Sequence, residues 1–193
     1  MKSALLSIII FSFSITAHGD VSNGSNIPIE LISISMDEVH SMKLGVIEEG
    51  DFVDEDETDV HTKEWFLTIP SGYKLSLFAD DNVVTSLKVM HPFFETDRGI
   101  KVGDKLSTVR GVYPDSIFSC DVSMFRNSGS LFLYSKNQKI IFIFYDKKIS
   151  SKIRQGVKCS IDDPEIQALE LYRISIGEAP KGLESSDNGI TGE

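Results

Sequence analysis

The residues whose types and spacing come closest to a known chemistry lie in an acidic tract in the first third of the chain. Asp54, Asp56 and Thr58 place oxygen donors at alternate positions, which is the spacing of ligands in a calcium-binding loop. The rest of that loop pattern is wrong, because Asp59 stands where the turn needs glycine and Trp65 stands where a bidentate glutamate is needed. We therefore predict no metal site and keep a weak calcium site as the alternative.

The whole acidic tract, residues 48–59, holds eight carboxylates in twelve positions. A charge run of this density resists burial, so we expect a solvated loop. The same carboxylates also suit a docking surface for a cationic protein, because long-range attraction accelerates the encounter. The candidate docking residues are Asp51, Asp54, Glu55, Asp56, Glu57 and Asp59.

Other sequence patterns that carry chemistry are missing. The sequence contains no Gly-x-Ser-x-Gly elbow and no phosphate-binding glycine loop. His40, His61 and His91 are not at metal-binding spacing, and we expect a structural role for each. The basic residues between Lys147 and Lys158 fit local charge compensation better than an anion patch. We expect a non-enzymatic protein without a cofactor.

The first nineteen residues have the pattern of a secretory signal peptide. Lys2 precedes an apolar run, and Ala17-His18-Gly19 places small residues at the two positions that a signal peptidase recognises. The run is too short to predict a membrane span, so an uncleaved anchor is the weaker alternative. We expect the mature protein in the periplasm without a membrane span, and secretion is the alternative location.

Cys120 and Cys159 are the two cysteines of the chain. An exported protein meets oxidising conditions, and an even count without a Cys-x-x-Cys pair favours one structural disulfide. Bridging a loop of this length stabilises a fold by roughly 4 kcal/mol in the chain-entropy model.

The net charge of −10 at pH 7 limits the kinds of partner. An acidic chain is repelled by nucleic acid and by anionic lipid surfaces, and it attracts cationic proteins. We expect an envelope accessory or protein-binding module, whose partner would be a basic periplasmic protein. The alternative is an inhibitor of a cationic cell-wall hydrolase that docks through the acidic surface.

The elements that would position these groups follow from hydrophobic periodicity and capping residues. Ile27–Ser33 alternates loosely, which predicts a strand. Ser35 and Glu38 form a capping box, and Gly45 is a suitable C-terminal cap, which together predict a helix at Met36–Leu44. Alternating segments then predict a three-stranded antiparallel meander with one solvated face, over Trp65–Ile69, Tyr73–Ala79 and Val83–Met90.

In the second half, Asp104 is the expected N-cap of a helix that carries Leu106, Val109 and Tyr113 on one face and ends at Pro114. The expected strands are Ile117–Phe125, Leu131–Tyr134, Lys139–Tyr145 and Leu169–Ile176. The apolar run Ile140–Tyr145 predicts a central strand that is covered on both faces. A basic loop or hairpin is expected at Asp146–Val157, and a helical turn from Asp163-Pro164.

These elements predict an α+β fold in which antiparallel β-sheet meanders pack on one or two short helices. The expected organisation is a signal peptide at 1–19, a flexible leader with a first strand at 20–34, one domain at 35–177 and a disordered tail at 178–193. A helix precedes strands twice, and the two helix starts, Ser35 and Asp104, lie 69 residues apart. A tandem helix-plus-sheet repeat would explain this order, but the slight identity between the halves favours coincidence.

One stretch also resembles a known family. A strand at Val84–Val89 leads through Thr96-Asp97 to Gly99-Ile100-Lys101-Val102-Gly103, and an amphipathic segment ending in an aromatic residue and then a cysteine follow. This order, closest over Thr96–Cys120, resembles the RpoE-regulated lipoproteins of Gram-negative envelopes, a family without an assigned activity. The resemblance implies an envelope location and no known catalytic residues. This chain differs from that family because no lipidation cysteine follows the apolar run.

Overall fold

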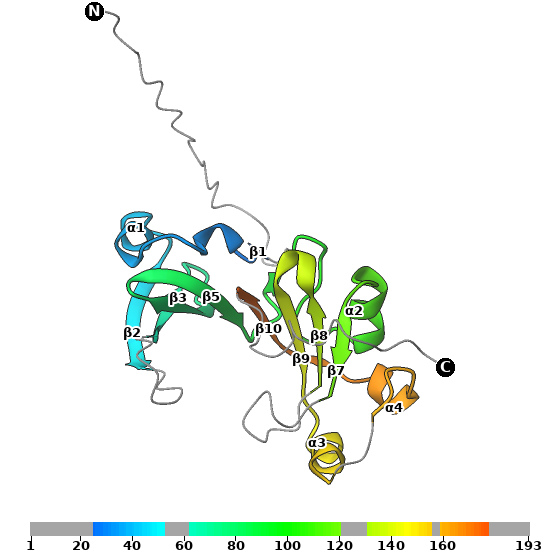
Figure 1. Cartoon of the computed structure of the whole chain (residues 1–193). Helices are drawn as coiled ribbons and strands as arrows, with labels where there is room; N and C mark the ends of the chain where they lie inside the picture. The colour runs from blue at the N-terminus through cyan, green and yellow to red at the C-terminus, as the bar shows by residue number, and fades with distance from the viewer. Residues whose placement is uncertain (1–24, 53–61, 121–130, 156–158, 178–193) are drawn as a thin grey trace, which may run out of the picture.

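The structure is a computed structural model that describes residues 25–52, 62–120, 131–155 and 159–177. These residues form an eight-stranded antiparallel sheet in the order β2-β3-β4-β5-β10-β9-β8-β7, with short helices beside it (Figure 1). A separate pair, β1 and β6, is parallel. The predicted α+β class with antiparallel meanders is confirmed.

The bounds of the elements divide into two halves of the chain. The first half contains β1 (Ser25–Asn26), η1 (Ile29–Leu31), α1 (Met36–Ser41), β2 (Val46–Phe52), β3 (Thr62–Thr68), β4 (Lys74–Asp80) and β5 (Val83–Val89). The second half contains β6 (Phe94–Glu95), α2 (Leu106–Val112), β7 (Ile117–Ser119), β8 (Leu131–Ser135), η2 (Lys136–Gln138), β9 (Ile140–Phe144), α3 (Lys147–Arg154), α4 (Pro164–Gln167) and β10 (Leu171–Gly177).

The two halves repeat one arrangement. Helix α1 precedes the meander β2-β3-β4-β5, and helix α2 precedes the meander β7-β8-β9-β10, which α3 and α4 interrupt before its last strand. The last strands of the two meanders, β5 and β10, pair antiparallel at the centre of the sheet, where Val89 lies opposite Ile174. The order of elements is therefore a topological repeat, and the expectation that it was coincidence was wrong.

The same set of backbone hydrogen bonds ties each helix start to the last strand of its own meander. In the first repeat, Ser33 N donates to Val84 O at 2.7 Å, and Val84 N donates to Ile34 O at 2.9 Å. Met36 N, at the first turn of α1, donates to Asn82 O at 2.8 Å. We call this three-bond arrangement the clamp.

The second repeat contains a matching clamp. Gly103 N donates to Leu171 O, Leu171 N donates to Asp104 O, and Leu106 N donates to Leu169 O, each at 2.8 Å. The residue that opens each clamp has a positive φ, 73° at Ser33 and 95° at Gly103. The helix starts that match are thus Met36 and Leu106.

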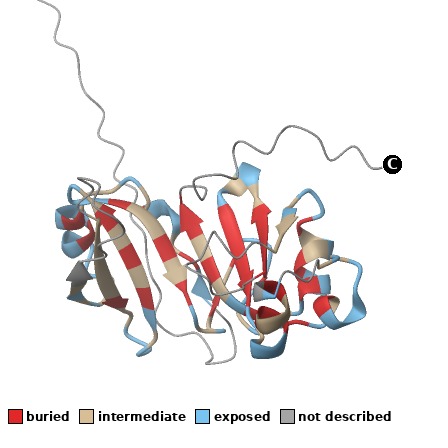
Figure 2. Cartoon of the chain, turned by 60° about the horizontal axis from the view of Figure 1, so that its bottom comes forward, coloured by how far each residue is buried: buried red, intermediate tan, exposed pale blue. Residues whose placement is uncertain are grey.

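Both helices pack on one face of the sheet. Met36 and Val39 of α1, and Leu106 and Val109 of α2, are at most 1% exposed and belong to one apolar core with the inward residues of the strands. Figure 2 shows these buried positions running across the sheet. On the opposite face of the second meander, a smaller buried cluster contains Phe132, Tyr134, Ile141 and Ile143. All five residues of β9 are buried, which confirms the predicted two-sided central strand.

The caps of the two helices differ in their agreement with the sequence. Ser35 caps α1 as predicted, since its side chain accepts a hydrogen bond from Glu38 N at 3.3 Å. The expected N-cap of α2 was wrong: Lys105 is the N-cap, and Asp104 instead accepts from Lys101 N at 2.8 Å. Helix α1 also ends earlier than expected, because the left-handed residue is Lys43, with φ 54°, and not Gly45.

Two segments expected to be loop or strand have another structure. The start of the acidic tract belongs to β2, which pairs with β3, so the solvated-loop expectation is wrong for this part. Its acids pair with lysines of the neighbouring strands: Glu48 contacts Lys74 at 3.0 Å, and Glu49 contacts Lys63. The strand expected at 27–33 is replaced by the 3-10 turn η1.

The basic segment after β9 is a helix and not a loop or hairpin. Asp146 caps α3 by accepting from Lys148 N at 2.9 Å and Ile149 N at 3.0 Å. On the neighbouring α4, Glu165 contacts Lys148 at 2.6 Å and Lys152 at 2.8 Å, and these bonds lower its carboxyl pKa to about 2. The lysines therefore compensate a local acid, as the sequence favoured. Helix α4 starts at Pro164, as predicted.

Within the described ranges, no helix has both the length and the apolar character needed to cross a membrane. The expected signal peptide and tail lie outside these ranges. So does most of Ile117–Phe125, of which β7 accounts for the first three residues.

The clamp predicts opposite effects for alanine at two glycines of the second repeat. Gly103→Ala should lower the free energy of unfolding by about 1 kcal/mol, because an L side chain is strained at φ 95° even though space is open there. Gly111→Ala, in α2 and facing open space, should raise it by roughly 0.5–1 kcal/mol. Urea unfolding of both variants checks this, and equal effects would contradict the role of the clamp residue.

Candidate functional site

The candidate site is a cavity of about 590 Å³ at one end of the β5–β10 pair. Because these strands are antiparallel, the start of β5 and the end of β10 meet there, and Gly177 lies opposite Ser86. Residues of η1 and of η2 also line the cavity, so both repeats contribute to it. We call it the junction cavity.

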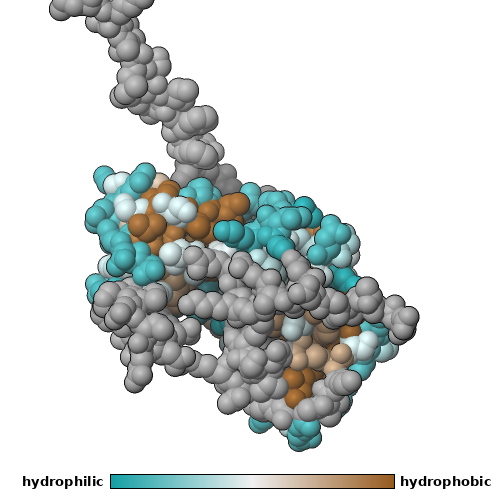
Figure 3. All heavy atoms as spheres, viewed as in Figure 1, coloured by the Kyte–Doolittle hydropathy of each residue, from teal (hydrophilic) through white to brown (hydrophobic). Residues whose placement is uncertain are grey.

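Most of the cavity wall is aliphatic. The first repeat contributes Ile27, Ile29 and Ile32, and the second contributes Ile140 and Ile176. Ile29 stays 53% exposed at the mouth, while Ile140 and Ile176 are buried at 4% each. Figure 3 shows apolar side chains gathered on the surface over η1. An apolar group that enters the cavity would lose contact with water on several sides.

The cavity also has one polar side, formed by Thr96, Asp97 and Gln138. Tyr113 links two of these residues, since its hydroxyl lies 3.0 Å from Thr96 Oγ1 and 3.3 Å from Asp97 Oδ1. Gln138 Nε2 donates to Asp97 Oδ2 at 3.4 Å. Thr96 Oγ1 further accepts from Ile100 N at 3.1 Å, which fixes the turn that carries it. These contacts form a single hydrogen-bonded group, which we call the Tyr113 network.

The network sits in a partly buried environment. Burial raises the pKa of the Tyr113 hydroxyl, and the negative charge of Asp97 raises it further. The hydrogen bond to Thr96 and the charge of Arg98 oppose this rise. The Arg98 guanidinium lies 4.9 Å from the centre of the Tyr113 ring and donates to Val112 O at 3.1 Å. The loop before α2 is thereby held against the end of that helix.

The arrangement suits binding more than bond-making. The polar side chains of the network contact one another and hold the loops of the second repeat in place, while the cavity wall offers apolar contact. In the described ranges, no group of three His, Cys, Asp or Glu side chains could hold a metal ion. A ligand would therefore be recognised by shape, burial and a few hydrogen bonds.

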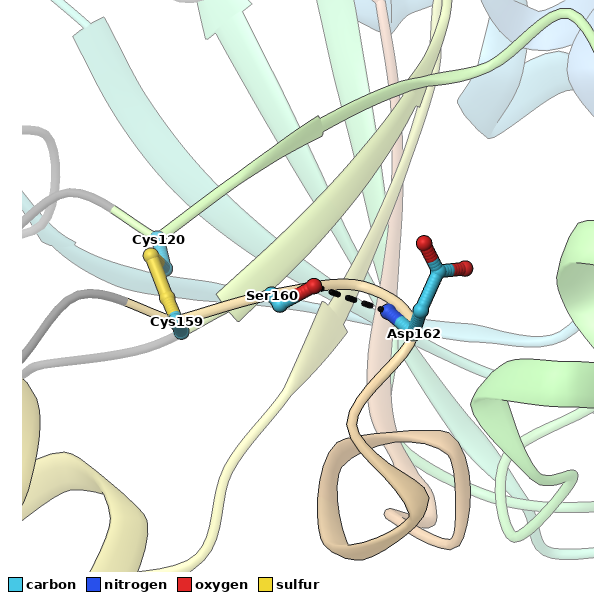
Figure 4. Close-up of a disulfide and its surroundings, with 4 residues drawn as sticks. All are labelled: Cys120, Cys159, Ser160 and Asp162. Carbon is cyan, nitrogen blue, oxygen red and sulfur yellow. Dashed lines mark hydrogen bonds between the residues drawn. A yellow bond between two sulfur atoms is a disulfide. The ribbon is translucent and has the colours of Figure 1, made fainter.

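The disulfide lies away from the cavity wall. Cys120, after β7, bonds to Cys159, before α4, with their Cα atoms 6.5 Å apart, as predicted (Figure 4). Asp162, close behind Cys159, donates its N–H to Ser160 Oγ at 3.3 Å, and its carboxylate contacts Arg110 of α2 at 2.9 Å. The bridge and this ion pair together attach the segment before β10 to the rest of the second repeat.

The predicted acidic docking surface falls largely outside the described residues. Asp54, Glu55, Asp56, Glu57 and Asp59 all lie there, and so does His61. Asp51 belongs to β2. The other two histidines make structural contacts: His40 meets Trp65 edge-on with ring centres 5.7 Å apart, and His91 Nδ1 accepts from Phe93 N at 3.1 Å.

Sequence reasoning missed the junction cavity itself. The isoleucines of η1 were assigned to a leader and its first strand, and Gln138 was assigned to a hairpin turn. Their apolar and polar characters were visible, but only the pairing of β5 with β10 brings them together. The Thr96–Pro114 segment was recognised as a structural unit, although its Thr96–Tyr113 hydrogen bond has no sequence signature.

Comparisons with known proteins add one likeness. No protein-family model and no curated protein matches the sequence. Among solved structures, the chain is similar to the crystal structure of the uncharacterized protein YfeY from Escherichia coli, with 11% identity and a TM-score of 0.49 over 81% of this chain and 100% of that chain. A likeness of this size says nothing about what the chain binds. The resemblance to RpoE-regulated lipoproteins stays a prediction.

The Tyr113 network predicts a pH dependence at alkaline pH. Since the pKa of Tyr113 is raised in the folded state, its stabilising contribution is complete below the model value of 10.0 and is lost as pH rises through the higher folded value. Tyr113→Phe should lower the free energy of unfolding by about 1 kcal/mol at neutral pH and flatten this alkaline decline. Unfolding by urea at neutral and alkaline pH checks this. Tyr172→Phe, at a 46% exposed tyrosine, is the control and should change neither quantity.

Proposed function

We propose that this chain is an exported, non-enzymatic protein of the bacterial envelope that acts as a binding or accessory module. The signal-peptide pattern of the first nineteen residues supports export, and the Cys120–Cys159 disulfide fits an oxidising compartment. The engaged side chains of the Tyr113 network support binding in preference to catalysis.

The observation that carries the proposal is the junction cavity. Its volume of about 590 Å³ lies within the range of roughly 300–1,000 Å³ that is typical of small-molecule sites. Its wall is mostly aliphatic and its polar groups are confined to one side, which is the usual composition of a binding site. We therefore propose the junction cavity as the binding site of the module.

Filling the cavity should remove binding of an apolar probe. Ile32 is half-buried on the wall, and Ile32→Trp should weaken binding of the fluorescent probe N-phenylnaphthylamine by about tenfold, because the indole occupies the space of the probe. The control is Val46→Trp, which adds the same side chain at a 63% exposed position outside the cavity. Circular dichroism and thermal melting establish that both variants fold.

The probe titration has a clear negative result. If the wild-type chain does not enhance probe fluorescence, or if both tryptophan variants reduce it equally, the junction cavity is not the binding site. Ile29→Gln provides a second variant at an exposed wall position, where a polar substitution leaves the core untouched.

We further propose that the protein partner of the module is basic. The net charge of −10 and the eight carboxylates of residues 48–59 support this, since they attract cations over a Debye length. The acids of the described strand β2 pair with lysines, so the charge available for a partner is expected at residues 54–59.

Partner capture from a periplasmic extract tests the charge proposal. Low-salt capture should recover a basic protein, and replacing the five acids of residues 54–59 with Asn and Gln should weaken recovery several-fold, as should raised salt. Recovery that is unaffected by both changes would remove the acidic tract from the interface.

A further inference from the structure

We propose that the ligand of the junction cavity is an amphipathic molecule with a flexible aliphatic chain and a cationic head that donates hydrogen bonds. This inference rests on the proposed binding function and adds the chemistry of the ligand.

The wall of the cavity favours an aliphatic chain over a flat ring. The side chains that supply the apolar wall are branched aliphatics, mainly isoleucine and valine, and the described lining contains no aromatic residue. Without an aromatic face, the site offers no stacking partner to a planar ligand. Methyl and methylene groups instead gain dispersion contacts and lose contact with water.

The polar side has more hydrogen-bond acceptors than donors. The single hydroxyl hydrogen of Tyr113 has two acceptors in reach, Thr96 Oγ1 and Asp97 Oδ1, and it can satisfy one of them at a time. The bond from Gln138 Nε2 to Asp97 is long, at 3.4 Å. Gln138 Oε1 is buried and accepts no hydrogen bond from the described residues. A ligand head that donates hydrogen bonds would supply what this side lacks.

Charge selects the sign of the head. Asp97 and Glu30 both line the cavity and both are exposed, whereas the lining contains one cation, Lys139. The excess of negative charge, within a chain of net charge −10, favours a cationic head over an anionic one. Because Asp97 is exposed, the head can stay hydrated at the rim while the chain enters the aliphatic interior.

Three probes with the same chain and different heads test the inference on the full protein. Decylamine, decanol and decanoate are titrated by calorimetry at low salt, each below its micelle concentration. Decylamine should bind about threefold to fivefold more tightly than decanol, since an exposed ion pair has this effect. Decanoate should bind most weakly.

Substitutions locate the head. Asp97→Asn keeps an acceptor oxygen for Tyr113 and Gln138 but should remove the preference for decylamine over decanol. The matched control Glu170→Gln removes one exposed charge outside the cavity and should keep the preference. Ile32→Trp should weaken all three probes, which separates binding in the cavity from attraction of the amine to the acidic surface.

The outcomes distinguish this inference from the proposed function. Decanoate binding as tightly as decylamine, or an unchanged preference in Asp97→Asn, overturns the inference. Binding of N-phenylnaphthylamine without binding of any decyl probe also overturns it and leaves the binding function in place. If neither class of probe binds, the cavity is not a binding site and both proposals fail.

Discussion

Two clamps of backbone hydrogen bonds fix where each helix starts relative to the last strand of its own meander. Backbone groups supply these bonds, so the clamps do not require particular side chains. What they require is a residue that accepts a positive φ, as Ser33 and Gly103 do, and a buried strand residue, as Val84 and Leu171 are. Two halves of a chain with slight identity can therefore fold to the same unit.

The pairing of the two repeats has a functional consequence. Because β5 and β10 run antiparallel, the first residues of one strand lie beside the last residues of the other, and loops from both repeats converge at that end. The junction cavity forms where η1 of the first repeat faces η2 of the second. Its aliphatic wall and its acceptor-rich side come from different repeats, so neither half contains the whole site.

Some elements could be predicted because their signals are local, and some could not. The Ser35 cap and the fully apolar β9 depend on neighbours within a few positions, and both predictions were confirmed. Helix α3 also carried a local signal, since Asp146 caps it and Ile149 and Ile153 are buried one turn apart, but its lysines suggested a loop. The start of the acidic tract could not be assigned, because its charges are compensated by lysines on strands β3 and β4, elsewhere in the sequence.

The sequence by itself determined the α+β class, most strand positions and the pairing of Cys120 with Cys159, because alternation, turn residues and a cysteine count need no knowledge of distant contacts. Tertiary structure decided the order of the strands, the repeat and the junction cavity. These depend on which strands pair and in what register, and hydrophobic alternation is the same for every order of strands. The hydrogen bonds of Tyr113 and Gln138 have the same origin, since their partners meet only after β5 and β10 have paired.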